Sequence, residues 1–174
     1  MGKEKIVDCF IPFSDLDEVK GTIAGLRKSG IVNKIFLLAV TQESKDRTGA
    51  TQSEAEAESE MIREEVAQME KCELVRIDSL RSSATVKKIA NHTTALYSLL
   101  YTRNSTLIPG FLALERMVKV AGDSGAVMVY ADHYQIIEGK RIASPVIDYQ
   151  FGSLRDDFNF GSLLLFNSSA FRKA

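Results

Sequence analysis

The sequence predicts an α/β fold with a mostly parallel, mixed sheet and helices on both faces. Short apolar runs without polar alternation recur along the chain, and such runs are typical of strands that are covered on both faces. Segments with helical apolar periodicity separate these runs, and strand–helix–strand order implies right-handed crossovers and parallel pairing. The 174 residues suffice for one domain with its own core, so we expect a single domain over residues 1–174.

The first half of the chain supplies three of the expected strands and two of the helices. The strands cover residues 5–12, 34–40 and 73–77, and the helices follow Ser14 and cover residues 54–70. Pro12 ends the first strand because proline cannot donate to a ladder. Ser14 is the expected N-cap of the first helix, and Gly30 marks its end. The helix over residues 54–70 is strongly acidic but keeps an apolar stripe, so we interpret its charges as a solvated outer face.

The second half continues the alternation and adds a hairpin. We expect helices over residues 84–94 and from Leu114 to a stop at Gly122, strands over 96–102, 126–131 and 161–166, and a last helix capped by Ser168 or Ser169. Glu138-Gly139-Lys140 predicts the turn of a hairpin over residues 136–146. The strand over 126–131 is wholly apolar, and we expect it to be covered on both faces.

Two polar side chains, Asp132 and His133, directly follow the apolar strand over residues 126–131. Open α/β sheets bind their ligands beyond the carboxyl ends of the strands. A carboxylate and an imidazole at this point are therefore candidates for a functional site. The alternative is that Asp132 only opens a turn and that His133 is simply solvated.

Composition and charge narrow the class of protein. A net charge of −1 gives no basic surface for nucleic acid, and no window has the apolar length of a membrane span. The polar start of the chain is not a signal peptide. Cys9 and Cys72 suit free thiols in a reducing compartment, and the two cysteines and two histidines have no zinc-site spacing. We therefore expect a cytoplasmic protein.

The ordered motifs of nearly the whole chain resemble the N-terminal, donor-binding part of a family 2 glycosyltransferase. The matching segments are Phe-Ile-Pro-Phe-Ser at 10–14, Leu-Ile-Pro-Gly-Phe-Leu-Ala-Leu at 107–114, Tyr-Ala-Asp at 130–132 and Phe-Gly-Ser-Leu-Leu-Leu-Phe at 160–166. Residues 152–158 look similar to a subgroup seen in gut Bacteroidetes. The resemblance implies a GT-A fold, which is the Rossmann-like fold of nucleotide-diphospho-sugar transferases.

The resemblance also implies a reaction and a set of site residues. A sugar would move, with inversion, from a nucleotide-diphospho-sugar donor to a hydroxyl of a glycan or lipid-linked acceptor, in the cytoplasm or at the inner face of the membrane. Donor-binding candidates are Pro12, Phe13, Asp78, Arg103, Asn104, Asp132 and His133. Catalytic candidates are Asp132 and Asp157. A divalent metal, Mn²⁺ or Mg²⁺, would be held by Asn104 and Asp132.

Three departures from the family pattern qualify these expectations. The stretch that corresponds to the family's acidic Asp-x-Asp motif reads Tyr-Thr-Arg-Asn at 101–104. This leaves three alternatives: the metal site is rebuilt with Asp132 or Asp157, Arg103 replaces part of the metal's charge, or this copy is weak or inactive. The second strand ends within Ala-Val-Thr-Gln at 39–42, which lacks the acidic residues that read the base and ribose in the family. No acidic helix that could supply the base follows residue 161, so we expect this chain to be the N-terminal portion of a longer enzyme.

Two other classes of function stay open at this point. A nucleotidyltransferase would share the nucleotide-binding sheet, but it predicts a glycine-rich loop with a basic residue after the first strand, which Pro-Phe-Ser-Asp at 12–15 lacks. A non-catalytic binding module with the same fold is the other alternative.

Overall fold

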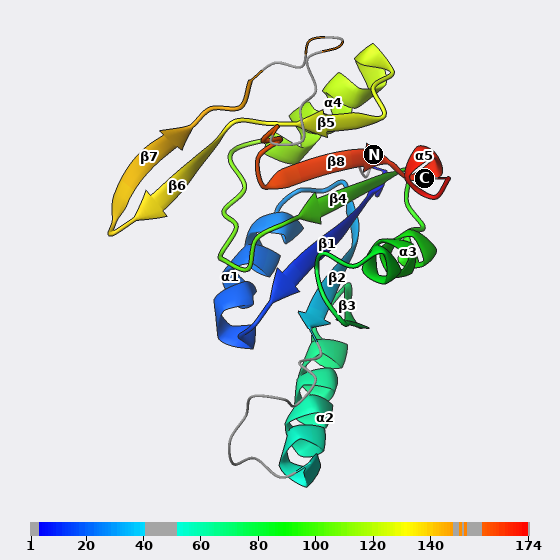
Figure 1. The fold of residues 1–174 in the computed structure, drawn as a ribbon, viewed down its shortest axis with the longest axis vertical. Helices are drawn as coiled ribbons and strands as arrows, with labels where there is room; N and C mark the ends of the chain where they lie inside the picture. The colour runs from blue at the N-terminus through cyan, green and yellow to red at the C-terminus, as the bar shows by residue number, and fades with distance from the viewer. Residues whose placement is uncertain (1–3, 41–51, 148–149, 151, 153–157, 174) are drawn as a thin grey trace.

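The computed structural model describes residues 4–40, 52–147, 150, 152 and 158–173, and of residues 52–59 it describes the backbone only. A six-stranded sheet forms its centre, with the order β3-β2-β1-β4-β8-β5 (Figure 1). Its strands are β1 (Val7–Phe13), β2 (Val32–Val40), β3 (Cys72–Ile77), β4 (Tyr97–Tyr101), β5 (Met128–Tyr130) and β8 (Leu163–Asn167). The helices are α1 (Leu16–Arg27), α2 (Gln52–Gln68), α3 (Ser83–His92), α4 (Ala113–Ser124) and α5 (Ser168–Phe171).

The sheet is mostly parallel, as the sequence predicts. β1 pairs in parallel with β2 and β4, and β2 pairs in parallel with β3. β8 runs antiparallel to both of its neighbours, β4 and β5. Strands β1 to β5 therefore all point the same way and end at one edge of the sheet, which we call the carboxyl edge; the opposite edge is the amino edge. The expected fold class is confirmed.

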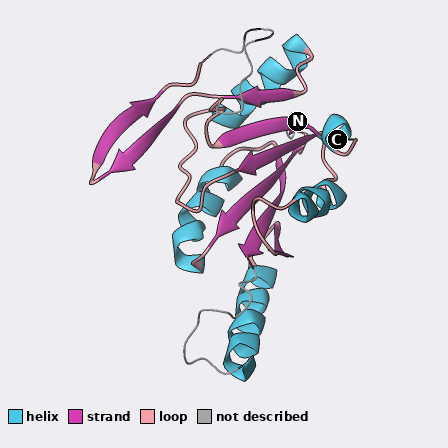
Figure 2. Cartoon of the chain, in the orientation of Figure 1, coloured by secondary structure: helices cyan, strands magenta, loops and turns pink. Residues whose placement is uncertain are grey.

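Helices cover both faces of the sheet, which is also as expected (Figure 2). The larger core packs α1, α2 and α4 on one face through buried residues such as Leu26, Val66 and Leu114. The smaller core packs α3 and α5 on the other face around Phe10 and Phe36, whose rings stack with centroids 4.7 Å apart. The hydrophobic spacing in the sequence therefore corresponds to two cores, one on each side of the sheet.

The ends of two helices differ from the expected positions. Asp15, not Ser14, is the N-cap of α1, and its carboxylate accepts the N–H of Asp17 at 2.7 Å. α4 passes through Gly122 and ends at Gly125, whose φ of 68° ends the helix in the left-handed region. Asp15 takes the N-cap position instead of Ser14, because its carboxylate accepts a helix N–H. Gly125 ends the helix instead of Gly122, because it adopts the left-handed backbone conformation that this position requires.

The expectation for the strand over residues 126–131 is wrong in one respect. β5 has only three residues and lies at the end of the sheet, with β8 as its one neighbour. Val129 is buried, but Val127, just before β5, is 56% exposed, and Met128 and Tyr130 are half-buried. β5 lies at the end of the sheet and α4 packs on one of its faces, so the apolar run is not covered on both sides.

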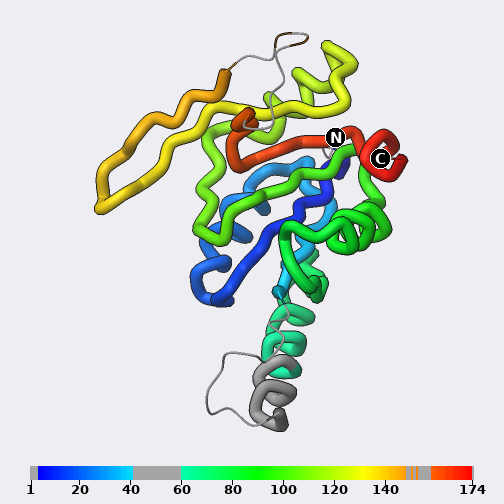
Figure 3. The backbone as a smooth tube through the Cα atoms, viewed as in Figure 1, coloured from blue at the N-terminus to red at the C-terminus, as the bar shows by residue number. Residues whose placement is uncertain are grey.

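A separate two-stranded sheet follows β5. β6 (His133–Ile137) pairs antiparallel with β7 (Lys140–Ser144), and this hairpin extends away from the rest of the molecule (Figure 1 and Figure 3). Glu138 and Gly139 have φ values of 49° and 74°, which is the two-residue type I′ turn that suits a twisted hairpin. The turn is where the sequence predicts it, but the paired strands span residues 133–144 and not 136–146.

The two thiols differ in burial, and this leads to a labelling prediction. Cys9 in β1 is fully buried, and burial together with the charge of Asp8 raises the pKa of its thiol. Burial also raises the pKa of Cys72, although Arg27, 3.6 Å from its sulfur, opposes the shift. Thiolates are the reactive species. In the native protein we expect Ellman's reagent to modify Cys72 slowly and Cys9 only after unfolding in urea. Equal native rates for the two thiols, read from Cys9→Ser and Cys72→Ser variants, would contradict this.

Candidate functional site

A small depression lies at the carboxyl edge, between the ends of β1 and β4. Its lining residues are Pro12, Phe13, Ser14, Asp15, Glu18, Val19, Asn104 and Ser105. Three donor-binding candidates from distant parts of the sequence, Pro12, Phe13 and Asn104, thus share one site. Parallel neighbouring strands bring this about, because their carboxyl ends meet at the same edge.

The wall that α1 contributes is acidic. Asp15 and Glu18 line the depression, and Asp17 lies in the same helical turn. Lys20 bonds Asp17 at 2.7 Å and Glu65 at 3.0 Å, and the bond from Lys20 lowers the pKa of Asp17. Carboxylates at this wall repel phosphate but accept hydrogen bonds from sugar hydroxyls and amino groups. The acidic first turn is visible in the sequence, yet only the fold shows that Asp15 and Glu18 face Asn104.

The opposite wall is the segment that leaves β4, and hydrogen bonds hold it against α1. The Tyr101 hydroxyl lies 2.7 Å from the Ser105 hydroxyl, and the Leu107 N–H donates to the Thr22 hydroxyl at 2.9 Å. Arg103 and Asn104 lie between these two anchors and are exposed. Within the described chain no carboxylate pairs with Arg103. Arg103 is therefore an exposed cation that directly precedes Asn104 in the lining of the depression.

Asp132 and His133 lie outside the depression, at the base of the hairpin. Asp132 Oδ1 accepts the N–H of Val146 at 2.7 Å, which ties the two ends of the hairpin together. The His133 ring packs against Gly161, and among the described residues neither ring nitrogen has a hydrogen-bond partner. Asp132 thus closes the base of the hairpin through one carboxylate oxygen, and its second oxygen has no hydrogen-bond partner among the described residues. Its role in donor binding stays a prediction.

The start of β8 separates the two groups of candidates at the carboxyl edge. The Thr102 N–H, next to Arg103, donates to the Ser162 carbonyl at 2.9 Å. Gly161 precedes Ser162 and lies beside Ala131 and His133. The structure thus places Asp132 and His133 across β8 from Arg103 and Asn104, at the same edge of the sheet but not in the same depression.

The remaining candidates are more distant or lie outside the described residues. Asp78 directly follows β3, two strands away from β1, and does not line the depression. Asp157 lies outside the described residues. In the part of the chain that the structure describes, no three His, Cys, Asp or Glu side chains come together as metal ligands. Asn104 lines the depression and Asp132 lies across β8 from it, and their joint role as metal ligands stays a prediction. Among the described helices, none has the length and apolar character to cross a bilayer.

Comparisons with known proteins identify the fold. No protein-family model matches the sequence, and no curated protein matches it significantly. The crystal structure of 4-diphosphocytidyl-2C-methyl-D-erythritol synthase from Anaerococcus prevotii DSM 20548 superposes with a TM-score of 0.54 over 97% of this chain and 73% of that chain. Sequence identity is 8%, so the likeness concerns the fold alone. The chain therefore has a Rossmann-like α/β fold similar to that of this synthase.

Proposed function

We propose that this chain is a glycosyltransferase domain of family 2 type, which binds a nucleotide-diphospho-sugar at the carboxyl edge. Its product would be a glycan or a glycosylated lipid, with the anomeric configuration inverted. One observation carries the proposal: Pro12, Phe13 and Asn104 line a single depression, and the exposed Arg103 directly precedes Asn104. This places polar and cationic groups at the edge where folds of this type bind nucleotides.

The charges around the depression suggest how the donor lies. Asp15 and Glu18 suit the ribose hydroxyls or an amino group of the base, since carboxylates accept hydrogen bonds. Arg103 suits the diphosphate, because a guanidinium can form two parallel bonds to a phosphate. The sugar would then extend across the start of β8 towards Asp132 and His133. Asp78 at the end of β3 is a further base or ribose contact in this proposal.

The proposed chemistry is a single displacement. The acceptor oxygen attacks the anomeric carbon, the bond from that carbon to the diphosphate oxygen breaks, and the acceptor proton passes to a carboxylate. Asp132, through the oxygen that Val146 leaves unused, or Asp157 would take that proton. Arg103 would stabilise the charge that develops on the leaving diphosphate. The described residues offer no complete metal site, so the proposed steps use protein groups alone. Titrations with Mn²⁺ and Mg²⁺ test whether a metal also takes part.

A nucleotidyltransferase is the second candidate, because the structurally similar protein is a synthase whose name contains a diphosphocytidyl group. The connection between β1 and α1 does not favour it. β1 ends at Phe13 and α1 begins at Leu16, so only Ser14 and Asp15 join them. A connection this short, with a carboxylate as N-cap, cannot wrap around a triphosphate, and it repels one.

Calorimetric titration with nucleoside diphosphates and triphosphates, with and without Mn²⁺ or Mg²⁺, tests the proposal. We expect saturable binding of a nucleoside diphosphate. Arg103→Ala should weaken it about tenfold or more, because a hydrogen bond to a charged group contributes about 1.5–3 kcal/mol. Arg116→Ala is the matched control, since Arg116 is exposed on α4, next to Glu115, which bonds Ser29 near the amino edge. Asp132→Ala should abolish binding of the sugar donor with little change in melting temperature.

Each alternative predicts a different outcome of the same titration. Binding of triphosphates only would favour the nucleotidyltransferase. Absence of binding for every nucleotide would leave a non-catalytic module. A similar loss of affinity in Arg103→Ala and Arg116→Ala would show that the contact is unspecific. If Asp132→Ala lowers the melting temperature instead of donor affinity, its bond to Val146 is its whole role.

A further inference from the structure

The hairpin formed by β6 and β7 has a role that the nucleotide site does not explain. Its base is fixed by Asp132, His133 and Val146, but beyond the base it pairs with no strand of the six-stranded sheet. Figure 1 and Figure 3 show it extending into solvent away from the helices. An isolated two-stranded hairpin is marginally stable in water, so a long uncovered one is a candidate for contact with another surface.

The outer part of the hairpin is apolar and basic at the same time. Ile136, Ile137 and Ile142 are 66%, 49% and 47% exposed. Lys140 and Arg141 stand opposite Ile137 and Ile136 in the paired strands, and all are within a few residues of the turn. Glu138 is the one acid in the hairpin, so cations outnumber anions there. We refer to residues 136–142 as the hairpin tip.

The isoleucines of the tip do not form a single face. Residues that pair directly across an antiparallel ladder share a face, so Ile136 lies with Arg141 on one side, and Ile137 lies with Lys140 on the other. Ile142 is on the same side as Ile137. Arg141 also stacks over the Tyr134 ring, with its guanidinium carbon 3.7 Å from the ring centroid. Each side of the tip thus combines an isoleucine with a cation.

This distribution fits a lipid surface better than a protein partner. A protein that docks on a hairpin covers one face or adds a strand to one edge, and it would leave the other isoleucines in water. A bilayer interface surrounds a tip from all sides, and anionic headgroups attract the lysine and the arginine. The outer edges of β6 and β7 carry unpaired backbone N–H and C=O groups, which the hydrocarbon core of a bilayer cannot hydrogen-bond. The tip can therefore enter only the headgroup interface. We infer that the hairpin tip docks on an anionic lipid surface.

The chain contains no tryptophan, which allows a direct test of this inference. In an Ile137→Trp variant the introduced residue is the sole tryptophan, and it keeps the tip apolar. With vesicles of phosphatidylcholine and phosphatidylglycerol we expect a blue shift of its emission and quenching by brominated lipids. Val120→Trp is the matched control, because Val120 is similarly exposed on α4. Its emission should not change.

Vesicle flotation of the unlabelled chain provides the second measurement. Lys140→Gln combined with Arg141→Gln should weaken binding to anionic vesicles by about fivefold per charge. Ile136→Ser combined with Ile137→Ser should weaken it about tenfold or more. Lys87→Gln combined with Arg116→Gln, on exposed helix positions, should have little effect. Wild-type binding should fall at high salt and be weak on pure phosphatidylcholine.

Several results would overturn the inference. One is failure of the wild-type chain to float with anionic vesicles. Another is flotation with unchanged emission from the Ile137→Trp variant, because another surface would then contact lipid. A third is a dimer, measured by light scattering, that the Ile136→Ser and Ile137→Ser changes dissociate, because the tip would then contact a second copy. None of these measurements depends on nucleotide binding, so they can fail while the proposed function stands.

Discussion

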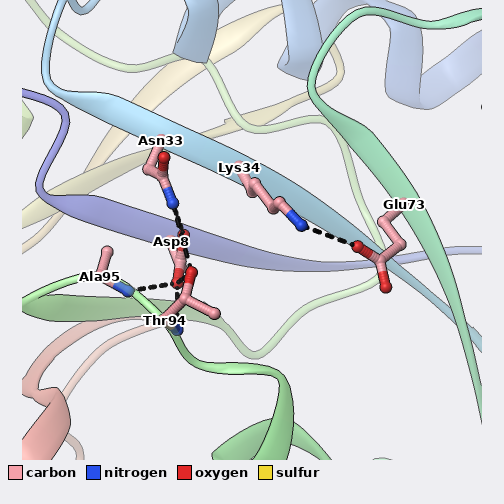
Figure 4. Close-up of polar contacts among 6 residues, drawn as sticks. All are labelled: Asp8, Asn33, Lys34, Glu73, Thr94 and Ala95. Atoms are coloured by element: carbon pink, nitrogen blue, oxygen red, sulfur yellow. Dashed lines mark hydrogen bonds and ion pairs between the residues drawn. The ribbon is translucent and has the colours of Figure 1, made fainter.

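Replacing Asp8 by alanine is expected to lower the free energy of unfolding by about 4 kcal/mol, because several donors lose one shared, buried and charged acceptor at once. Asp8 is fully buried in β1. Its Oδ2 accepts the backbone N–H groups of Thr94 and Ala95, both at 2.7 Å, and the Thr94 hydroxyl at 3.1 Å (Figure 4). Its Oδ1 accepts the side-chain amide of Asn33 at 2.8 Å. Alanine would leave these donors without their shared acceptor, at a position where the side chain is fully buried.

Urea denaturation followed by circular dichroism measures this loss, and two further variants locate its origin. Asp8→Asn keeps the shape but turns an amide towards donors, so we expect a loss of about 2 kcal/mol. Glu73→Ala is the control, because Glu73 makes a half-exposed ion pair with Lys34 in the same region (Figure 4). Such a pair contributes about 0–1 kcal/mol. Similar losses in Asp8→Ala and Glu73→Ala would show that the buried contacts add no stability.

The role of Asp8 illustrates what local patterns can and cannot predict. The apolar periodicity around it predicts β1, because periodicity is a property of neighbouring residues. Its partners are Asn33 at the start of β2 and the turn between α3 and β4, which are distant in sequence. A single acid inside a strand gives no sign of this. Asp8 joins β1, β2 and β4 at the amino edge, and it thereby fixes how β1 and β4 meet at the opposite edge.

The strand over residues 126–131 shows a different reason for an incorrect expectation. Its apolar run predicts a strand correctly, but burial on both faces depends on its neighbours in the sheet. β8, which comes later in the chain, inserts between β4 and β5 and leaves β5 at the end. β8 runs antiparallel to both neighbours, and the apolar pattern within it specifies neither its direction nor its place in the sheet.

The candidate site was predictable where it depends on parallel strand ends and unpredictable where it depends on turn geometry. Pro12, Phe13 and Asn104 come together because β1 and β4 are parallel neighbours. Asp132 follows the same rule, but its carboxylate is engaged by Val146 at the other end of the hairpin. The sequence contains both residues, yet the bond between them depends on a hairpin that begins earlier than its turn signal suggests.

Gly161→Ala is expected to cost about 2–3 kcal/mol, as the sum of backbone strain and overpacking. Gly161 has a φ of 80°, in the left-handed region that disfavours residues with a Cβ atom. An added Cβ would lie 3.3 Å from Val146 Cγ1, 3.4 Å from the Ala131 carbonyl oxygen and 3.5 Å from His133 Nδ1. The Val146 contact is tighter than usual, and the other two are ordinary van der Waals contacts that leave an added Cβ atom no room to move away from Val146.

Gly139→Ala separates the two contributions. Gly139, in the hairpin turn, has a similar φ of 74°, but nothing lies within 4 Å of an added Cβ. We expect a loss of about 1 kcal/mol from strain alone. Urea midpoints of the two variants then give the packing cost by difference, and equal midpoints would contradict the argument.

Gly161 also adjoins Ser162, whose carbonyl accepts the Thr102 N–H beside Arg103. Gly161→Ala should therefore weaken nucleotide binding, whereas Gly139→Ala should leave it unchanged.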